Sequence, residues 1–249
     1  MRQREDQSLG AQIEQIFQCH KRRYGYRRIA EELRDLGLTC SDERVRGLMK
    51  ERELVAIQPK TYVPRTSDGR ADAPSPNLLA NQKLPSAPNQ VLAGDITHIP
   101  TAQGWAYLAV VIELCTRKIV GWKLAQHMRS ELVTEALSAA THRQSIQAGA
   151  VFHRDRGSQY GSLRFWDFLR QKQMRQSMFG RANLYDNAWT ESVIGTIKAE
   201  VLQGGKFADI RDAHTELFEY IESYYNHQRK HSSLDYDTPV QFENRFYQN

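Results

Sequence analysis

The order of apolar segments in residues 91–205 places the strongest limit on what this chain can fold into. A first strand is predicted around Asp95, because the apolar residues Val91, Leu92, Ile96 and Ile99 surround it. Strand and helix patterns then follow one another along the chain. The predicted elements are strands 105–114 and 118–124, a helix 130–143, a strand that ends before Asp155, a helix 163–172, a strand 175–177 and a helix with Glu191. This order predicts an α/β domain.

Three acidic residues within this domain are candidates for a common functional site. Between Asp95 and Asp155 lie 59 residues, and between Asp155 and Glu191 lie 35. Asp155 follows a short apolar run, and Gly157 and Ser158 break the strand, so Asp155 is expected at a carboxyl edge, where open α/β sheets place their sites. Magnesium prefers oxygen ligands, and phosphoryl transfer uses two such ions about 4 Å apart. The pattern therefore predicts a metal site for phosphodiester chemistry.

The helix that carries Glu191 is predicted from its cap and its apolar stripe. Either Asp186 or Asn187 could be the N-cap. At about 100° per residue, Glu191 falls beside the stripe, with Asn187 and Lys198 on the same face. The buried stripe is expected to consist of Ile194, Ile197 and Val201. Taken alone, each acid of the three could equally be a solvated surface group or a helix cap.

The sequence around the acids resembles a known family. The segments are HRDRGSQY at 153–160, SMFGRANLYDNAWTESVIGTIKAE at 177–200 and YYNHQRKHSSLDYDTPVQF at 224–242. They are similar to the second-frame (OrfB) transposases of bacterial insertion sequences, which are related to retroviral integrases. The likeness extends from about Tyr24 to Phe242. It implies an RNase H-like catalytic core of the retroviral integrase type, in which the first and fourth strands are neighbours.

The resemblance also implies roles for particular residues. Asp95, Asp155 and Glu191 match a DDE triad that binds two Mg²⁺ or Mn²⁺ ions and catalyses DNA cleavage and strand transfer. Lys198 matches a basic residue associated with the transposon end. In one departure, Leu92 stands where the family often has Trp, a change expected to affect packing rather than chemistry.

Further DNA contacts are expected from residues near the acids and in the tail. By their position in the family's motifs these are Gln159, Tyr160, Asn187 and Arg229. As lone residues, the first three would be surface polar groups. The tail segment with Arg229 could suit a phosphate surface, or it could simply dock a long helix, 212–225, onto the core.

The N-terminal residues predict an all-α unit. Apolar residues recur at helical spacing in three stretches, Gly37 lies in a turn, and Ser41 could cap the third helix. Two helices joined through a glycine-bearing turn suggest a helix-turn-helix DNA-binding domain. In the third helix, Arg44, Arg46 and Lys50 would be free to reach DNA.

Proline usage divides the chain. Residues 58–88 hold six of the eight prolines, which predicts a semi-extended linker. The predicted organisation is a helix-turn-helix domain 1–57, this linker, an RNase H-like core 89–205 and a helical C-terminal extension 206–249.

Composition is consistent with DNA binding without requiring it. The net charge is +5, and residues 1–70 carry 15 Lys and Arg against 11 Asp and Glu. No apolar run is long enough for a membrane span, which predicts a soluble intracellular protein. The resemblance implies that the protein is bacterial, cytoplasmic and nucleoid-associated. Cys19, His20 and Cys40 could belong to a zinc site, but without a paired CxxC ordinary packing is preferred.

The expected partners are double-stranded DNA (transposon ends and target), further copies of the chain on DNA, and an upstream reading-frame (OrfA) product or a frameshift fusion with it. Two alternatives remain open. One is a DNA-binding repressor with a vestigial catalytic fold, against which three intact acids speak. The other is an RNase H-like nuclease, against which the N-terminal domain and the tail speak.

Overall fold

The computed structural model describes residues 2–58, 75–80, 85–155, 157–178 and 188–248. The chain divides into two units. One contains Met1–Lys60 together with Lys198–Gln203, and the other contains Thr61–Ile197 and Gly204–Asn249. Among the described residues, no helix combines the length and the apolar character that crossing a membrane demands.

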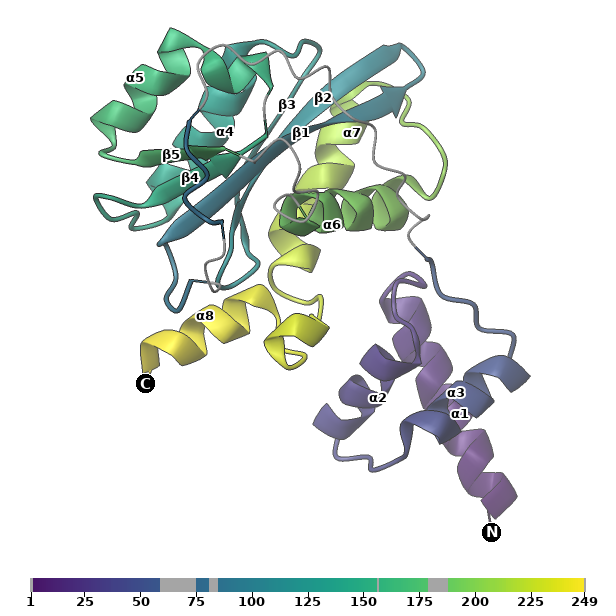
Figure 1. The fold of residues 1–249 in the computed structure, drawn as a ribbon. Helices are drawn as coiled ribbons and strands as arrows, with labels where there is room; N and C mark the ends of the chain where they lie inside the picture. The colour runs from purple at the N-terminus through teal and green to yellow at the C-terminus, as the bar shows by residue number, and fades with distance from the viewer. Residues whose placement is uncertain (1, 59–74, 81–84, 156, 179–187, 249) are drawn as a thin grey trace. The chain divides into compact units, whose positions relative to one another are not determined.

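The first unit is built from three helices, as predicted (Figure 1). They are α1 (Arg2–Cys19), α2 (Tyr26–Asp35) and α3 (Asp42–Glu51). Their apolar residues at helical spacing form the core: Ile13, Phe17, Ile29, Ala30, Leu33, Val45, Leu48 and Met49. Ser41 caps α3, because its Oγ accepts a hydrogen bond from the Arg44 backbone N–H at 3.3 Å. Gly37 has φ +78°, a left-handed conformation that suits glycine in the turn between α2 and α3.

The second unit is built on a five-stranded sheet (Figure 1). The strands are β1 (Val91–Thr101), β2 (Gly104–Glu113), β3 (Ile119–Ala125), β4 (Val151–Arg154) and β5 (Arg175–Met178). Their order is β3-β2-β1-β4-β5. The first three strands are antiparallel neighbours, whereas β4 runs parallel to both β1 and β5. The first and fourth strands therefore lie side by side, as the resemblance to the integrase-type core implied.

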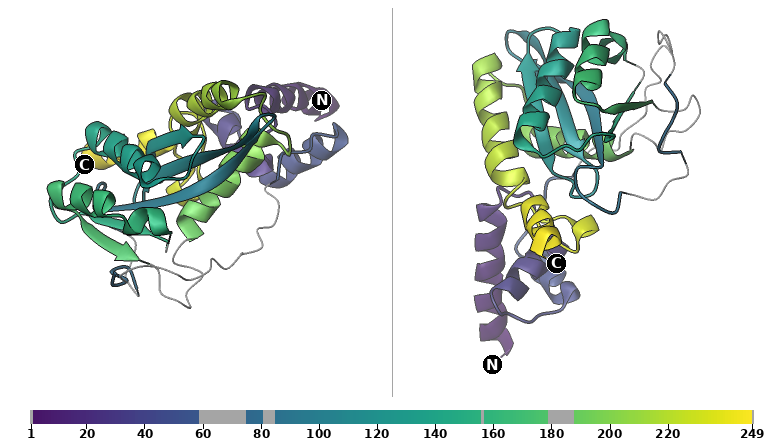
Figure 2. Two further views of the ribbon diagram at one scale, coloured as in Figure 1. Left: turned by 90° about the horizontal axis from the view of Figure 1, so that it is seen from above. Right: turned by 90° about the vertical axis from the view of Figure 1, so that its left-hand side faces the viewer.

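One face of the sheet is covered by α4 (Ser130–Arg143) and α5 (Leu163–Gln171). The apolar side of α4 packs with Leu92, Val111 and Phe152 in a single hydrophobic core. The approach is close at Gly121 of β3, where a Cβ atom would lie 2.2 Å from the backbone oxygen of Ala136. Only a glycine fits there. Figure 2 shows the sheet and its helices from two further directions.

The opposite face contacts α6 (Ala188–Ile197) and α7 (Ile210–Phe218). Strand β3 presents Trp122 to this face, with its ring centroid 5.1 Å from that of His214 in α7. The Trp122 Nε1–H donates to Glu222 Oε1 at 2.7 Å. Helix α7 continues as a π-helical stretch, Glu219–Tyr225, so the predicted helix 212–225 is found in two pieces of different pitch.

Both edges of the sheet are in contact with other segments. At the β3 edge, the Ile119 backbone N–H donates to Asn226 Oδ1 at 3.0 Å, and Asn226 Nδ2 donates to the Ile119 backbone oxygen at 2.9 Å. The tail thus docks onto the core, one of the two roles expected for it, and ends with a 3₁₀ turn (Ser232–Leu234) and α8 (Pro239–Gln248).

At the β5 edge, residues 75–80 of the predicted linker lie along the strand. The Met178 N–H donates to the Pro76 oxygen at 3.2 Å, and the Leu78 N–H donates to Ser177 Oγ at 2.9 Å. This part of the linker therefore packs against the core. Residues 59–74 and 81–84 are outside the described residues, and the predicted domain boundaries remain predictions.

The predicted buried stripe of the Glu191 helix was wrong in part. The buried residues are Thr190, Val193 and Ile197, whereas Ile194 and Val201 are half-buried. Thr190 is polar, so a prediction based on apolar residues could not include it in the buried stripe. After Ile197 the backbone changes to a π-helical turn, Lys198–Leu202, whose wider pitch breaks the α-helical period.

Candidate active site

Strand pairing brings the two aspartates together. Gly94 of β1 pairs with Arg154 of β4, so the next residues along these parallel strands, Asp95 and Asp155, are lateral neighbours. Neighbouring strands are about 4.8 Å apart. Ile96 packs toward the core under α4, so alternation along β1 points Asp95 to the face that α6 and α7 contact.

The Asp155 carboxyl lies just past the end of β4 in a partly buried position. Its Oδ1 accepts a hydrogen bond from the Gly157 N–H at 2.9 Å, and Arg154 Nη1 donates to the Asp155 backbone oxygen at 2.9 Å. Burial raises the pKa of Asp155, while the Gly157 hydrogen bond and the charge of Arg154 act in the opposite direction. The net rise means that a carboxylate here is short of compensating positive charge.

Tyr160, in the core under α4, is influenced electrostatically by both aspartates. Its ring is only 2% exposed and packs against Phe152 and Phe165. Burial raises the pKa of its hydroxyl, and the charges of Asp155 and Asp95 raise it further, so both carboxylates lie within electrostatic reach of this one group. The ring therefore belongs to the core and not to a surface that DNA could contact.

The third acid, Glu191, is in the first turn of α6, the helix that contacts β1. It is half-buried, and burial raises the pKa of its carboxyl. Across the described residues, no three His, Cys, Asp or Glu side chains gather closely enough to hold a metal ion together. The structure thus aligns the two aspartates and puts Glu191 on the helix over their sheet, and the three-acid site remains a prediction.

The other predicted DNA contacts have different surroundings. Gln159 is partly buried, and its Nε2 donates to the Met128 backbone oxygen at 3.2 Å. Lys198 opens the π-helical turn after α6. Arg229 is only 6% exposed, and its guanidinium carbon lies 5.7 Å from the Tyr225 ring centroid, so it packs within the tail. Asn187 and Asp186 are outside the described residues.

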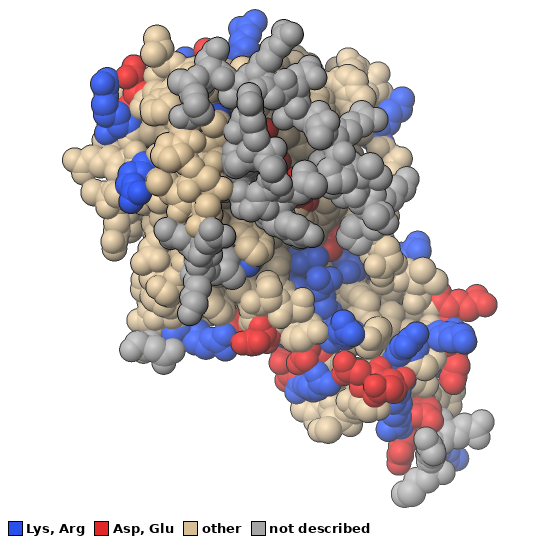
Figure 3. Space-filling view, in the orientation of Figure 1, with Lys and Arg blue, Asp and Glu red and all other residues tan. Residues whose placement is uncertain are grey.

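The basic residues of α3 are not equivalent. Arg44 donates to Asp6 Oδ1 of α1 through Nε at 2.9 Å and through Nη2 at 2.6 Å. Arg46 and Lys50 are exposed. Figure 3 shows acidic and basic side chains interspersed on the visible face of the helical unit. Arg46 and Lys50 are therefore better placed than Arg44 to meet a phosphate backbone.

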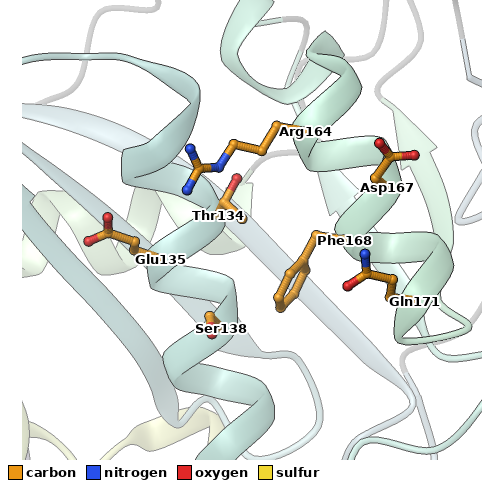
Figure 4. A pocket seen from close by; sticks show the side chains of 7 residues that line it. All are labelled: Thr134, Glu135, Ser138, Arg164, Asp167, Phe168 and Gln171. Carbon is orange, nitrogen blue, oxygen red and sulfur yellow. The ribbon is translucent and has the colours of Figure 1, made fainter.

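A pocket of about 700 Å³ lies between α4 and α5 (Figure 4). Its lining residues are Thr134, Glu135, Ser138, Arg164, Asp167, Phe168 and Gln171. In Figure 4 the ring of Phe168 points from α5 into the space between the two helices. Both helices cover the face of the sheet from which Asp95 points away, so this pocket is separate from the acids.

Two features near the acids were missed by the reading of the sequence. Arg154, the residue before Asp155, is buried and lies against Tyr160, with its guanidinium carbon 5.9 Å from the ring centroid. Its position directly before the predicted catalytic Asp155 could have identified Arg154 as a residue of the site. The other feature is a contact between Arg117 and Trp189. These two residues are far apart in the sequence, and no local pattern joins them.

Two roles are conceivable for His153, which is two residues before Asp155: a hydrogen-bond partner of a metal ligand, or a core histidine. It is fully buried in β4, and its Nδ1 shares a hydrogen bond with Ser177 Oγ of β5 at 2.8 Å. A side chain held in this way fits the core alternative.

Comparison with known proteins agrees with this architecture. Residues 85–183 and 172–239 match descriptions of an integrase core domain, and residues 3–62 match an HTH-like domain. The solved structure of a simian T-cell lymphotropic virus intasome, in complex with a PP2A regulatory subunit, resembles the chain with a TM-score of 0.54 at 14% identity. That match covers 82% of this chain and 67% of the other, and it supports the integrase-type fold alone.

Sequence relatives are similar over almost the whole chain. The transposase for insertion sequence element IS904 of Lactococcus lactis is 39% identical over 96% of this chain and 94% of its own length. The transposase InsF for insertion sequence IS3A of Escherichia coli is 35% identical over 92% of this chain and 80% of its own length. With an integrase-type core, an HTH-like domain and this degree of identity, the chain belongs to the insertion-sequence transposases.

Proposed function

We propose that this chain catalyses DNA strand cleavage and strand transfer of an insertion sequence through a two-metal DDE mechanism, with Asp95, Asp155 and Glu191 as the metal-binding acids. Membership of the transposases implies an enzyme that cuts and joins DNA. The observation that supports the finer proposal is the pairing of Gly94 with Arg154 in adjacent parallel strands, because Asp95 and Asp155 are the next residues along the two chains.

The donor set fits divalent cations of the magnesium type. All three side chains offer carboxylate oxygens, the ligands that such hard cations prefer. Burial raises the pKa values of Asp155 and Glu191, and the charges of Asp95 and Asp155 raise the pKa of the buried Tyr160 hydroxyl. Negative charge held in a partly buried site is stabilised by a cation, so the site is suited to Mg²⁺ or Mn²⁺.

In this proposal the chain's own residues position the reactants. Asp95 of β1 and Asp155 just past β4 would hold the cations, and Glu191 of α6 would supply a further carboxylate ligand. When bound, the cations would lower the pKa of an attacking water or DNA 3′ hydroxyl and stabilise the departing oxygen. No side chain forms a covalent bond with DNA. The basic residues Arg46 and Lys50 of α3 contact phosphates and carry no step of the reaction.

The proposal also includes further DNA contacts and protein partners. Gln159, Asn187 and Lys198 contact DNA near the acids, and the working enzyme is an oligomer on DNA. An upstream reading-frame product assists in recognising the ends.

The test uses labelled duplexes with the element's terminal sequence, Mg²⁺ and the purified chain, with and without the upstream reading-frame product. We expect strand-transfer products from the wild type and none from Asp155→Asn, while both proteins shift the duplex equally in a gel. Asp167→Asn, an exposed aspartate on α5, is the matched control and should retain activity. Wild-type joining by Asp155→Asn would remove the triad assignment. DNA binding without joining by the wild type, even with its partner, would favour a regulatory protein.

A further inference from the structure

A cation–π contact connects the turn after β2 to the helix that carries Glu191. The guanidinium carbon of Arg117 lies 4.4 Å from the ring centroid of Trp189. Arg117 belongs to the turn between β2 and β3, and Trp189 is in the first turn of α6, two residues before Glu191. A guanidinium within about 6 Å of an indole ring is attracted by its π-electrons, and Trp is the strongest aromatic partner.

The turn that presents Arg117 is held firmly by its own hydrogen bonds. The Glu113 carboxylate is only 1% exposed and accepts from the backbone N–H groups of Cys115 at 3.2 Å and Thr116 at 2.7 Å. It also accepts from the Thr116 hydroxyl at 2.8 Å. These bonds fix the turn, so the guanidinium projects from a defined point at the end of the sheet.

The backbone of Arg117 adds a second observation. Its φ is +61°, in the left-handed region that favours glycine. Strained conformations persist where the surroundings impose them and are frequent at functional sites. A glycine would be comfortable here but would offer no guanidinium to Trp189.

The start of α6 is where an added contact has most influence. Thr190, Val193 and Ile197 form the inward side of the helix and hold it against the sheet. Such a stripe leaves a helix some freedom to rotate about its axis. Trp189 is half-buried at the edge of this stripe, one turn before Val193, so a contact at Trp189 resists rotation at the end of the helix that carries Glu191.

We propose that Arg117 and Trp189 form a positioning pair, which fixes the first turn of α6 and so the direction of the Glu191 carboxyl. This inference rests on the proposed role of Glu191. Neither residue touches the reacting atoms. Because a displacement of about 1 Å at a catalytic group can cost about 100-fold in rate, loss of the pair should reduce strand transfer without abolishing it.

The experiment compares Trp189→Ala and Arg117→Met with the conservative variants Trp189→Phe and Arg117→Lys. Lys172→Met is the matched control, since it removes a similar contact at the end of α5, where the Nζ of the C-cap residue Lys172 lies 5.8 Å from the Phe168 ring centroid. The first readout is amide hydrogen exchange across α6 in protein free of divalent ions. The second is the Mg²⁺ concentration that gives half-maximal strand transfer.

We expect Trp189→Ala and Arg117→Met to speed exchange in the first turns of α6 about 10-fold and to slow strand transfer about 10- to 100-fold, with a higher Mg²⁺ midpoint. Trp189→Phe and Arg117→Lys should recover part of each loss, and the double variant should be no worse than either single one. Lys172→Met should match the wild type.

Two results separate the possible failures. If Trp189→Ala and Arg117→Met keep wild-type exchange and Mg²⁺ dependence while Glu191→Gln abolishes strand transfer, the positioning pair is overturned and the triad stands. If Glu191→Gln retains strand transfer, the triad fails, and with it the catalytic part of the inference. Should the severe variants unfold, Trp189→Phe and Arg117→Lys decide: wild-type values in both would reject the pair.

Discussion

The face of the sheet under α4 and the face that meets α6 and α7 are stabilised by different interactions. Under α4, apolar side chains from both strands and helices form one core, and the helix approaches so closely that Gly121 cannot carry a side chain. On the other face, Val193 and Ile197 of α6 also pack inward, but β1 offers Asp95 there, and polar contacts such as the Trp122–Glu222 hydrogen bond add to the apolar ones. The first face supplies rigidity, and the second exposes charged groups at fixed positions on that support.

This contrast predicts that replacing an acid on one face reduces strand transfer far more than replacing an acid on the other face. We expect Asp95→Asn to reduce strand transfer at least about 1,000-fold, equivalent to about 4 kcal/mol, because a metal-binding carboxylate contributes several kcal/mol to the transition state. Glu135→Gln on α4 removes only a surface pair with Lys123 and should leave the rate within about 2-fold. Initial rates on a terminal duplex measure both. Equal losses in the two variants would show that the faces do not differ in function.

The core under α4 should dominate stability. Phe152 is fully buried in β4, so Phe152→Ala should lower the free energy of unfolding by about 3–5 kcal/mol. Urea denaturation followed by circular dichroism gives this value. Asp95→Asn, measured beside it, should change the free energy of unfolding much less. A cost below about 1 kcal/mol for Phe152→Ala would mean that the face under α4 is not the main core.

A pair of glycine substitutions compares the packing of the two faces. At Gly121 the added methyl group would meet the Ala136 and Ala140 backbone, so Gly121→Ala should destabilise by about 1–3 kcal/mol. At Gly195 of α6 no atom lies within 4 Å of the added methyl, so Gly195→Ala should stabilise by about 0.5–1 kcal/mol through helix propensity. The same denaturation measurement serves for both. Changes of the same sign would contradict the contrast in packing.

The smallest expected effect concerns pH. Burial raises the folded-state pKa of Asp155 above its ordinary value of 3.8, so wild-type stability is greatest below that value and declines as pH rises through the folded-state pKa. Asparagine does not titrate. Without divalent ions at neutral pH, Asp155→Asn should therefore melt at a higher temperature than the wild type, and the difference should disappear as the pH falls below 3.8. Calorimetry across this range would detect it, and a lower melting temperature for the variant at pH 7 would contradict the direction of the shift.

Much of the scaffold could be predicted from the sequence, because its signals are local. Helix α4 was predicted at 130–143 and is found at Ser130–Arg143, since its apolar residues follow one helical period. The strands were placed to within a few residues for the same reason. Once β1 and β4 are neighbours, register alone places Asp95 and Asp155 one residue past the paired Gly94 and Arg154.

The site itself was harder to predict, because it depends on contacts between distant residues. Tyr160 was expected to face DNA, yet three-dimensional packing buries its ring between Phe152 and Phe165. The inward residues of α6 include the polar Thr190, which an apolar pattern cannot detect. The contact between Arg117 and Trp189 requires the sheet to be assembled first, so no spacing in the sequence could reveal it.

The two hydrogen bonds between the Asn226 side chain and the Ile119 backbone have a consequence for the solubility of shortened forms of the protein. An uncovered outer strand is a template on which other chains can add strands and aggregate. Here one amide side chain occupies the backbone groups of Ile119 at the outer strand β3. A product that ends before Asn226, whether made by early termination or by proteolysis, would expose that strand. Such fragments should self-associate, whereas in a chain that includes Asn226 the Ile119 backbone groups are already hydrogen-bonded.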